Sequence, residues 1–173
     1  MEPHFDLPPS PWVQRWVGWI RPGGAVLDLA CGSGRHSRLL ARLGFEVDAV
    51  DRAPELFERP PPHVALLAAD LEGAPWPYSG RRFDGIVATN YLHRPLLPLL
   101  ADSLEHGGIL IYETFARGNE RFGKPSNPAF LLAPGELLEA FRARLHIIAY
   151  EDLVVDDPRP AAVQRLCARL PPA

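Results

Sequence analysis

Hydrophobic positions along the chain alternate between two spacings, one typical of strands and one typical of helices. Continuous or every-second apolar residues predict strands at 25–30, 45–51, 64–69, 83–91 and 104–115. Helical spacing follows the first strand, where apolar or small residues recur at Ser37, Leu39, Leu40 and Leu43. This alternation is typical of a mostly parallel sheet with helices on both faces.

A helix is also expected before the first strand. Ser10-Pro11 is a helix start signal, and one apolar face follows it at Trp12, Val13, Trp16, Val17 and Ile20. Such a face packs on a sheet, so residues 1–22 are expected to add a leading helix to a core of residues 23–173. The whole chain is then a single domain.

Prolines limit two of the connections between strands. The run Pro60-Pro61-Pro62 leaves room only for a short helix near 54–58. Pro95 and Pro98 are expected to confine or kink a helix between Tyr91 and Ser103.

The C-terminal third predicts a helix and then a hairpin. The helix runs from 134 to 141, and strands at 146–153 and 162–170 flank the short turn 156–160. Residues 116–128 form a polar loop that is long for a compact domain, which leaves two interpretations: a lid over a site or a solvated excursion.

The segment Val26–Ser37 predicts a ligand-binding turn, because a buried strand breaks into a glycine loop and continues as a helix. A dinucleotide site requires a third glycine, and that place holds Ser37. Asp28 stands just before the turn, where a carboxylate would repel pyrophosphate and attract an ammonium group. The segment therefore favours a cofactor that carries an amino acid.

The run Leu27-Asp28-Leu29-Ala30-Cys31-Gly32-Ser33-Gly34 resembles motif I of the class I S-adenosylmethionine-dependent methyltransferases. Asp51, Asp70-Leu71, the run 83–91 and the glycine-led strand at 104–113 resemble this family's later motifs. The compact cofactor half is most similar to small bacterial methyltransferases of the tellurite-resistance type. The resemblance implies a Rossmann-like three-layer αβα sandwich with a seven-stranded, mostly parallel sheet in the order 3-2-1-4-5-7-6 and an antiparallel C-terminal hairpin.

The same resemblance implies S-adenosyl-L-methionine as cofactor. Asp51 would accept hydrogen bonds from the ribose hydroxyls, and Asp70 would read the adenine edge. The full set expected to contact the cofactor is Asp28, Cys31, Gly32, Gly34, His36, Asp51, Arg52, Asp70, Leu71 and Asn90.

Candidate acceptor residues follow the fourth and fifth strands. His93 has an intrinsic pKa suited to a general base, and Tyr91 is its polar neighbour. The expected substrate contacts are Arg94, Glu113, Arg117 and Arg121. Asn90 lacks a following Pro-Pro-aromatic sequence, which argues against methylation of exocyclic amines of bases.

The composition of the chain limits the classes of partner that are expected. At 173 residues and net charge −3, the chain has no electrostatic footprint for nucleic acid, so a small-molecule substrate is expected. No apolar run approaches the roughly 20 residues that span a bilayer, and the N-terminus lacks a signal-peptide layout, so no membrane partner and a cytoplasmic location are expected. Two distant cysteines form neither a disulfide framework nor a metal site.

Two other functions remain open at this point. A noncatalytic S-adenosylmethionine-binding regulatory domain would keep Asp28 and Asp51 without needing an acceptor pocket. A nicotinamide-dependent oxidoreductase accounts only for the first strand and Asp51.

Overall fold

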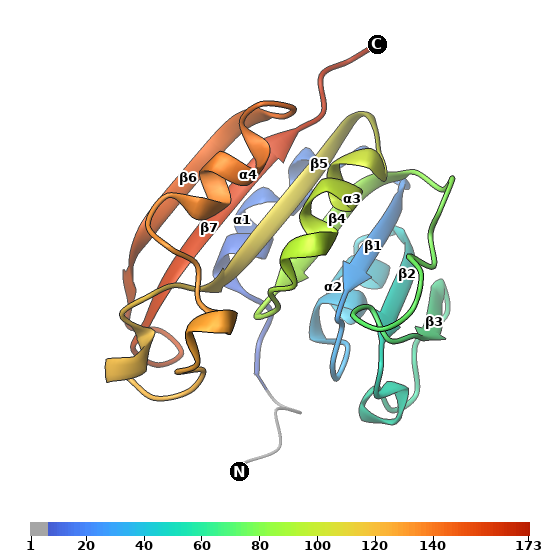
Figure 1. Cartoon of the computed structure of the whole chain (residues 1–173). Helices are drawn as coiled ribbons and strands as arrows, with labels where there is room; N and C mark the ends of the chain where they lie inside the picture. The colour runs from blue at the N-terminus through green and yellow to red at the C-terminus, as the bar shows by residue number, and fades with distance from the viewer. Residues whose placement is uncertain (1–6) are drawn as a thin grey trace.

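Seven strands form one mixed sheet in the order β3-β2-β1-β4-β5-β7-β6 in the computed structural model, which describes residues 7–173 (Figure 1). The strands are β1 Ala25–Leu29, β2 Glu46–Asp51, β3 Val64–Ala68, β4 Phe83–Thr89, β5 Leu104–Phe115, β6 His146–Val155 and β7 Ala161–Arg169. β1 to β5 are parallel, whereas β7 runs antiparallel to both β5 and β6. The expected strand order and C-terminal hairpin are therefore confirmed.

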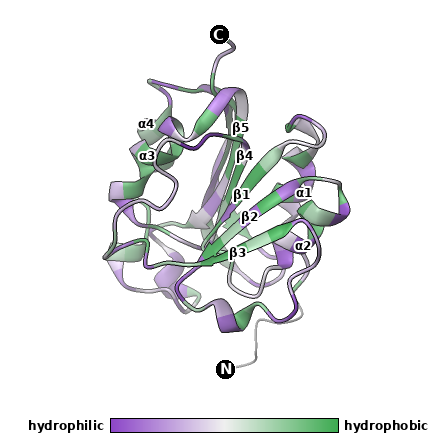
Figure 2. Ribbon diagram, turned by 90° about the vertical axis from the view of Figure 1, so that its right-hand side faces the viewer, coloured by the Kyte–Doolittle hydropathy of each residue, from purple (hydrophilic) through white to green (hydrophobic). Residues whose placement is uncertain are grey.

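Helices cover both faces of this sheet (Figure 1). α1 Pro11–Trp16 and α2 Arg35–Arg42 pack on one face, and α3 Leu97–Asp102 and α4 Glu136–Phe141 pack on the other. Figure 2 shows hydrophobic residues along the strands between the two layers. The chain thus has three layers, with apolar side chains on both faces of the central strands.

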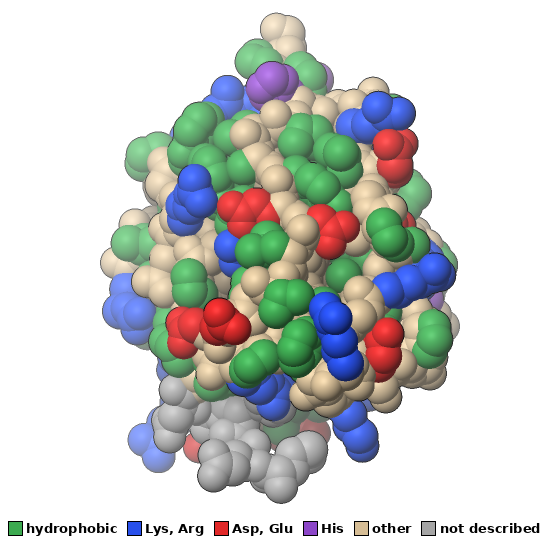
Figure 3. Space-filling view, turned by 90° about the vertical axis from the view of Figure 1, so that its left-hand side faces the viewer, with side chains coloured by type: hydrophobic (Ala, Val, Ile, Leu, Met, Phe, Trp, Pro, Cys, Tyr) green, Lys and Arg blue, Asp and Glu red, His purple; other side chains and the backbone are tan. Residues whose placement is uncertain are grey.

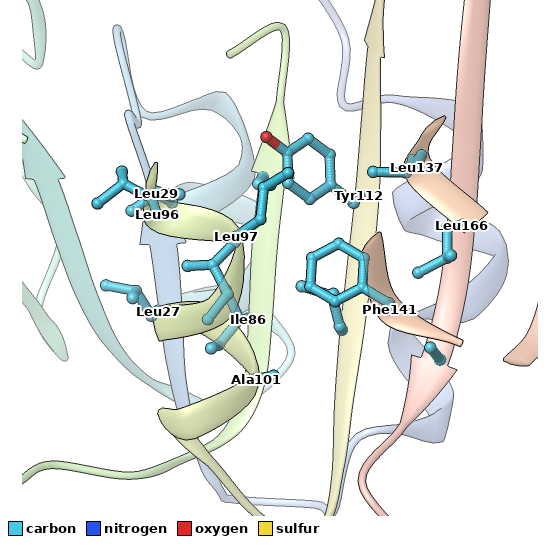
Figure 4. Packing of buried hydrophobic residues seen from close by; sticks show 14 of the residues in the cluster. Leu27, Leu29, Ile86, Leu96, Leu97, Ala101, Tyr112, Leu137, Phe141 and Leu166 are labelled. Carbon is cyan, nitrogen blue, oxygen red and sulfur yellow. The ribbon is translucent and has the colours of Figure 1, made fainter. Parts of the chain in front are cut away.

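The larger core cluster lies between the sheet and the α3/α4 layer (Figure 4). Tyr112 from β5 and Phe141 from α4 have ring centroids 6.3 Å apart and are almost fully buried. The Tyr112 hydroxyl donates to the carbonyl oxygen of Tyr91 at 2.7 Å. This bond fixes the backbone just after β4, so the core helps to position the loop that follows this strand.

The leading helix α1 has the expected buried face but is short. Ser10 caps it by accepting from the backbone N–H of Trp12, and Pro11 occupies the first turn. Trp12 is 2% exposed and donates its indole N–H to the carbonyl oxygen of Leu166. The helix continues only as a 3₁₀ turn, Val17–Trp19; residues 1–6 of the predicted segment lie outside the described residues.

Two other connections are also shorter than a full helix. The β2–β3 connection holds only the 3₁₀ turn Pro54–Leu56, as its prolines predict. After β4, the 3₁₀ turn Arg94–Leu96 precedes α3, so the helix expected from Tyr91 begins only at Leu97. The reason is that Asn90 leaves the strand with a φ of 55°, and prolines occupy both first turns.

The burial of Trp12 predicts a large loss of stability when its side chain is removed. Trp12→Ala is expected to lower the free energy of unfolding by about 3–5 kcal/mol, because it leaves a cavity between α1 and the sheet. Trp19→Ala is the control: this side chain is 47% exposed, and we expect a loss below about 1 kcal/mol. Urea denaturation measures both, and similar losses would contradict the role of Trp12 as the anchor of α1.

Candidate functional site

Three clefts meet where the parallel strands end, at the lower end of the sheet in Figure 1. Asn90 and Phe115 line all three. We name the clefts as arms of one trough. The acidic arm, of about 400 Å³, includes Asp51, Arg52, Asp70, Leu71, Glu72 and Tyr91. The basic arm includes Lys124, Pro125, Asn127, Phe130 and Arg159. The strap arm lies beneath residues 7–11, which we call the strap, and it includes Arg35, Glu113 and Arg165.

The glycine loop and Asp51 are joined by hydrogen bonds. Gly32 N–H donates to Oδ2 of Asp51 at 2.9 Å, and Ala53 N–H donates to Oδ1 at 2.9 Å. Each carboxylate oxygen keeps a further lone pair for a ligand in the acidic arm. A Cβ at Gly32 would meet no protein atom within 4 Å, so space is open in front of this part of the loop.

Asp70 presents an ionised carboxylate at the other end of the acidic arm. Its Oδ1 accepts from the backbone N–H of Glu72 at 3.0 Å. The backbone N–H groups of Glu72 and Gly73 lower the pKa of Asp70, because they stabilise its charged form. Leu71 beside it is buried, which adds an apolar wall to this polar edge.

Asn90 and Tyr91 shape the junction of the arms. Asn90 has a left-handed backbone, and its N–H donates to the carbonyl oxygen of Glu113 at 2.9 Å. Burial, then the nearby charges of Glu72 and Asp70, raise the pKa of Tyr91 to about 12. At neutral pH the Tyr91 phenol is therefore protonated and can donate a hydrogen bond into the acidic arm.

Asp28, which was expected to meet an ammonium group, lies beneath the glycine loop and lines none of the three arms. Its side chain is buried, and Oδ2 accepts from the Ser37 hydroxyl at 2.6 Å. Burial raises its pKa to about 6. The carboxylate links β1 to the first turn of α2, and so it supports the loop from behind.

His36, Cys31 and Gly34 also have structural surroundings. Nε2 of His36 accepts from the Ser10 N–H at 2.9 Å, and Nδ1 lies 3.4 Å from the Thr89 hydroxyl, so neither nitrogen is left for a cofactor. Burial lowers the pKa of His36 to about 3, so the ring is neutral. Burial raises the pKa of the Cys31 thiol. A Cβ at Gly34 would lie 2.4 Å from the Phe57 ring, so this glycine is needed for packing.

His93 and Arg94 do not line the trough either. Nδ1 of His93 lies 3.7 Å from Oε1 of Glu72, beside the acidic arm. Arg94 makes a two-pronged ion pair with Glu136 and also donates to the carbonyl oxygens of Ala129 and Leu131. All three nitrogens of its guanidinium donate to the loop after β5 or to Glu136, so Arg94 holds this loop in place.

The loop after β5 contributes to the trough through residues other than those expected. Arg117 and Arg121 are exposed and outside all three arms, and Nε of Arg121 donates to the carbonyl oxygen of Gly118. The loop is not a solvated excursion: buried Asn119 donates to the carbonyl oxygen of Pro125 and accepts from the Ala162 N–H. These bonds hold the Lys124–Asn127 segment against the basic arm.

Opposite charges face the strap arm. Glu113 accepts from the Ser10 hydroxyl at 2.8 Å, and Arg165 lies 3.4 Å from its other oxygen. Arg35 donates to the carbonyl oxygen of Pro8 at 2.8 Å. Burial lowers the pKa of Arg35, whereas the charge of Glu113 raises it. Arg35 is not among the residues expected to contact a ligand, although its place directly after the glycine loop was a usable signal.

Comparisons with known proteins show which proteins this chain is similar to. Residues 26–108 match the family described as a methyltransferase domain. The ubiquinone biosynthesis O-methyltransferase of Xanthomonas campestris pv. campestris (strain B100) is 33% identical over 115 residues, which cover 56% of this chain and 45% of that protein. The 23S rRNA (uracil(1939)-C(5))-methyltransferase RlmD of Shewanella sp. (strain MR-7) is 35% identical over 78 residues, 37% of this chain and 17% of that protein. The chain thus spans less than half the length of these relatives.

Solved structures extend the agreement to the whole fold. TehB from Haemophilus influenzae has a TM-score of 0.71 at 20% identity, covering 92% of this chain and 61% of that one. N-methyltransferase NodS from Bradyrhizobium japonicum WM9, solved with S-adenosyl-L-homocysteine, has a TM-score of 0.69 at 15% identity, covering 99% and 93%. With the strand order, these findings show that residues 26–108 are similar to a methyltransferase domain and that the whole chain has the fold of the class I S-adenosylmethionine-dependent methyltransferases. The cofactor of this class is S-adenosyl-L-methionine.

Helix length and the distribution of surface charge bear on which partners the protein can have. None of the helices within residues 7–173 is long and apolar enough to span a bilayer. Figure 3 shows arginine and lysine side chains scattered among acidic and hydrophobic ones on the face that lies at the left of Figure 1.

The raised pKa of Asp28 predicts a pH-dependent stability. The folded state holds this proton up to about pH 6, whereas the unfolded chain releases it near pH 3.8. The free energy of unfolding of the wild type, relative to Asp28→Asn, should therefore fall as the pH rises from about 4 to above 6, by on the order of 3 kcal/mol. Urea denaturation across this range measures the difference, with Asp152→Asn on the exposed part of β6 as control. A constant difference would contradict the assigned protonation.

Proposed function

We propose that this protein transfers the methyl group of S-adenosylmethionine to a small-molecule acceptor. The observation that carries the proposal is the meeting of three chemically different arms at Asn90 and Phe115. A bound cofactor has two polar ends, the adenosine and the amino acid, with the reactive methyl between them. Two arms suffice for these ends, which leaves the basic arm for the acceptor.

The acidic arm suits the adenosine. Asp51 ends β2 and has lone pairs for both ribose hydroxyls, while its existing bonds to Gly32 and Ala53 keep the carboxylate in place. Asp70 and the buried Leu71 offer a polar edge beside an apolar wall, as adenine requires. Arg52 and Tyr91 close the sides of this arm.

The strap arm suits the amino acid end. A zwitterion needs one cation and one anion, and Arg35 and Glu113 supply them across one cleft. The open space before Gly32 admits a ligand close to the loop backbone, where a side chain would block it. Glu113, rather than Asp28, is then the carboxylate that meets the ammonium group.

Methyl transfer from this cofactor requires little of the protein beyond alignment of the two reacting groups. The sulfonium supplies an activated methyl group, and S-adenosylhomocysteine is the product that leaves. The chain's contribution is to hold the accepting atom in line with the methyl carbon at the junction and to exclude water there. Asn90 and Tyr91 can donate hydrogen bonds at this point, whereas His93, turned toward Glu72, is not needed as a base.

The small size of the acceptor is supported by the trough itself. Its arms are bounded by the strap, by the hairpin turn and by the anchored loop after β5. The curated O-methyltransferase relative adds to the case, since its name concerns the biosynthesis of ubiquinone, a small molecule. The accepting atom is left to experiment.

The role of Asp51 predicts a loss of cofactor affinity. Asp51→Ala removes a charged hydrogen-bond acceptor for the ribose and should weaken S-adenosylhomocysteine binding roughly 10- to 100-fold. Calorimetry measures the affinity, and thermal melting checks that the variant is folded. Asp152→Ala removes an exposed carboxylate outside the trough and should bind normally. Equal affinities for the two variants would exclude Asp51 from the ribose site.

Methyl transfer itself is tested by release of S-adenosylhomocysteine from S-adenosylmethionine with a panel of phenols, amines and thiols. At least one acceptor should give turnover that Asp51→Ala reduces at subsaturating cofactor. Binding of the cofactor without turnover of any acceptor would instead favour a regulatory domain. Absence of cofactor binding would refute the proposal.

A further inference from the structure

The basic arm carries two cations and no carboxylate. Lys124, the single lysine of the sequence, and Arg159 both line it, and the remaining lining residues are uncharged. The chain as a whole has a net charge of −3, so the charge of this arm is opposite in sign to that of the chain. It also contrasts with the acidic arm, where Asp51, Asp70 and Glu72 outnumber Arg52.

These two cations are not used by the fold. Neither Lys124 nor Arg159 makes a hydrogen bond or an ion pair with another residue in the described range 7–173, and both are exposed. By comparison, Arg94 and Arg165 are each paired with a glutamate. A cation that stabilises nothing in the folded protein remains available to a ligand.

A flat apolar surface lies beside the two cations. Phe130 is 49% exposed, and Phe115 and Pro125 line the same arm next to it. Exposed aromatic side chains at a cleft are a large apolar surface for a ring to stack on. Asn90 supplies a polar group at the inner end, where the arm meets the other two.

The loop that carries these groups is held in place. Asn119 ties the Pro125 carbonyl to the start of β7, and Arg94 ties the carbonyls of Ala129 and Leu131 to α4 through Glu136. The backbone beside Lys124 and Phe130 is therefore held by side-chain hydrogen bonds. A loop that is already ordered loses less freedom when it binds a ligand.

From these observations we infer that the methyl acceptor is an aromatic oxyanion: a planar ring held against Phe115, Pro125 and Phe130, with its anionic group paired to Lys124 and Arg159. This inference rests on the proposed function and adds the substrate class to it. In the proposed function Arg35, in the strap arm, meets the carboxylate of the cofactor; Lys124 lines only the basic arm, whereas Arg159 lies where the basic and strap arms adjoin.

The experiment compares matched aromatic probes on protein saturated with S-adenosylhomocysteine. 3,4-Dihydroxybenzoate should bind at least about tenfold more tightly than its uncharged methyl ester, as expected for a charged hydrogen bond. Phenyl phosphate and benzoate, compared in the same way, identify which oxyanion the arm prefers. Calorimetry or ligand-observed NMR gives the dissociation constants.

The double variant Lys124→Gln, Arg159→Gln should lose this discrimination, with about tenfold weaker binding of the dihydroxybenzoate and unchanged affinity for S-adenosylhomocysteine. The control, Arg42→Gln with Arg59→Gln, removes the same charge from exposed arginines that line none of the three arms and should behave as wild type.

Three results would overturn the inference: equal binding of acid and ester, no binding of either, or a double variant that loses S-adenosylhomocysteine instead. In the last case the cations serve the cofactor. If the wild type binds S-adenosylhomocysteine but does not prefer the acid, only the substrate class fails. If it does not bind S-adenosylhomocysteine, the proposed function fails with it.

Discussion

The site depends on two residues that leave adjacent strands with a left-handed backbone. Ala30 follows β1 with a φ of 52°, and Asn90 follows β4 with a φ of 55°. Neither is glycine, and a conformation of this kind costs on the order of 1–3 kcal/mol at each position. The buried sheet supplies the stability to hold both, because β1 and β4 are apolar on either face. Their divergence opens the crevice at the point where the strand order reverses.

The three arms of the trough differ in charge, and the net charge of the chain does not show this difference. Acids predominate in the acidic arm, arginines and carboxylates line the strap arm together, and cations are the only charged groups of the basic arm. Each arm is therefore complementary to a different chemical group. The contact of all three arms with Asn90 brings these groups to one point, which is the requirement for a transfer reaction.

Several polar side chains near the trough hold its surrounding elements together. Arg94 joins the loop after β5 to α4, and Arg165 joins Glu113 of β5 to Glu151 of β6. His36 likewise joins the strap to α2 through Ser10. Such polar links fix loops whose short helices bury little apolar surface. This explains why a chain with such short connections between its strands still forms defined clefts.

The sequence by itself determined the elements, their order and the acids at the strand ends. Hydrophobic spacing, prolines and glycines act within a few residues, so the glycine loop, the shortened connections and the C-terminal hairpin could be predicted locally. Asp51 and Asp70 were predictable for the same reason, since each directly follows a strand.

Only the tertiary structure decided which polar side chains remain free. The partner of Arg94 lies 42 residues away, and Ser10 is 103 residues from Glu113. No local sequence pattern reveals such pairs. Arg94 and His36 were therefore predicted to contact ligands, although in the fold they bond to Glu136 and Ser10. Lys124 was one of several polar residues in a loop that could bind a polar substrate, but only folding brings it into one cleft with Arg159 and leaves both without a partner among residues 7–173.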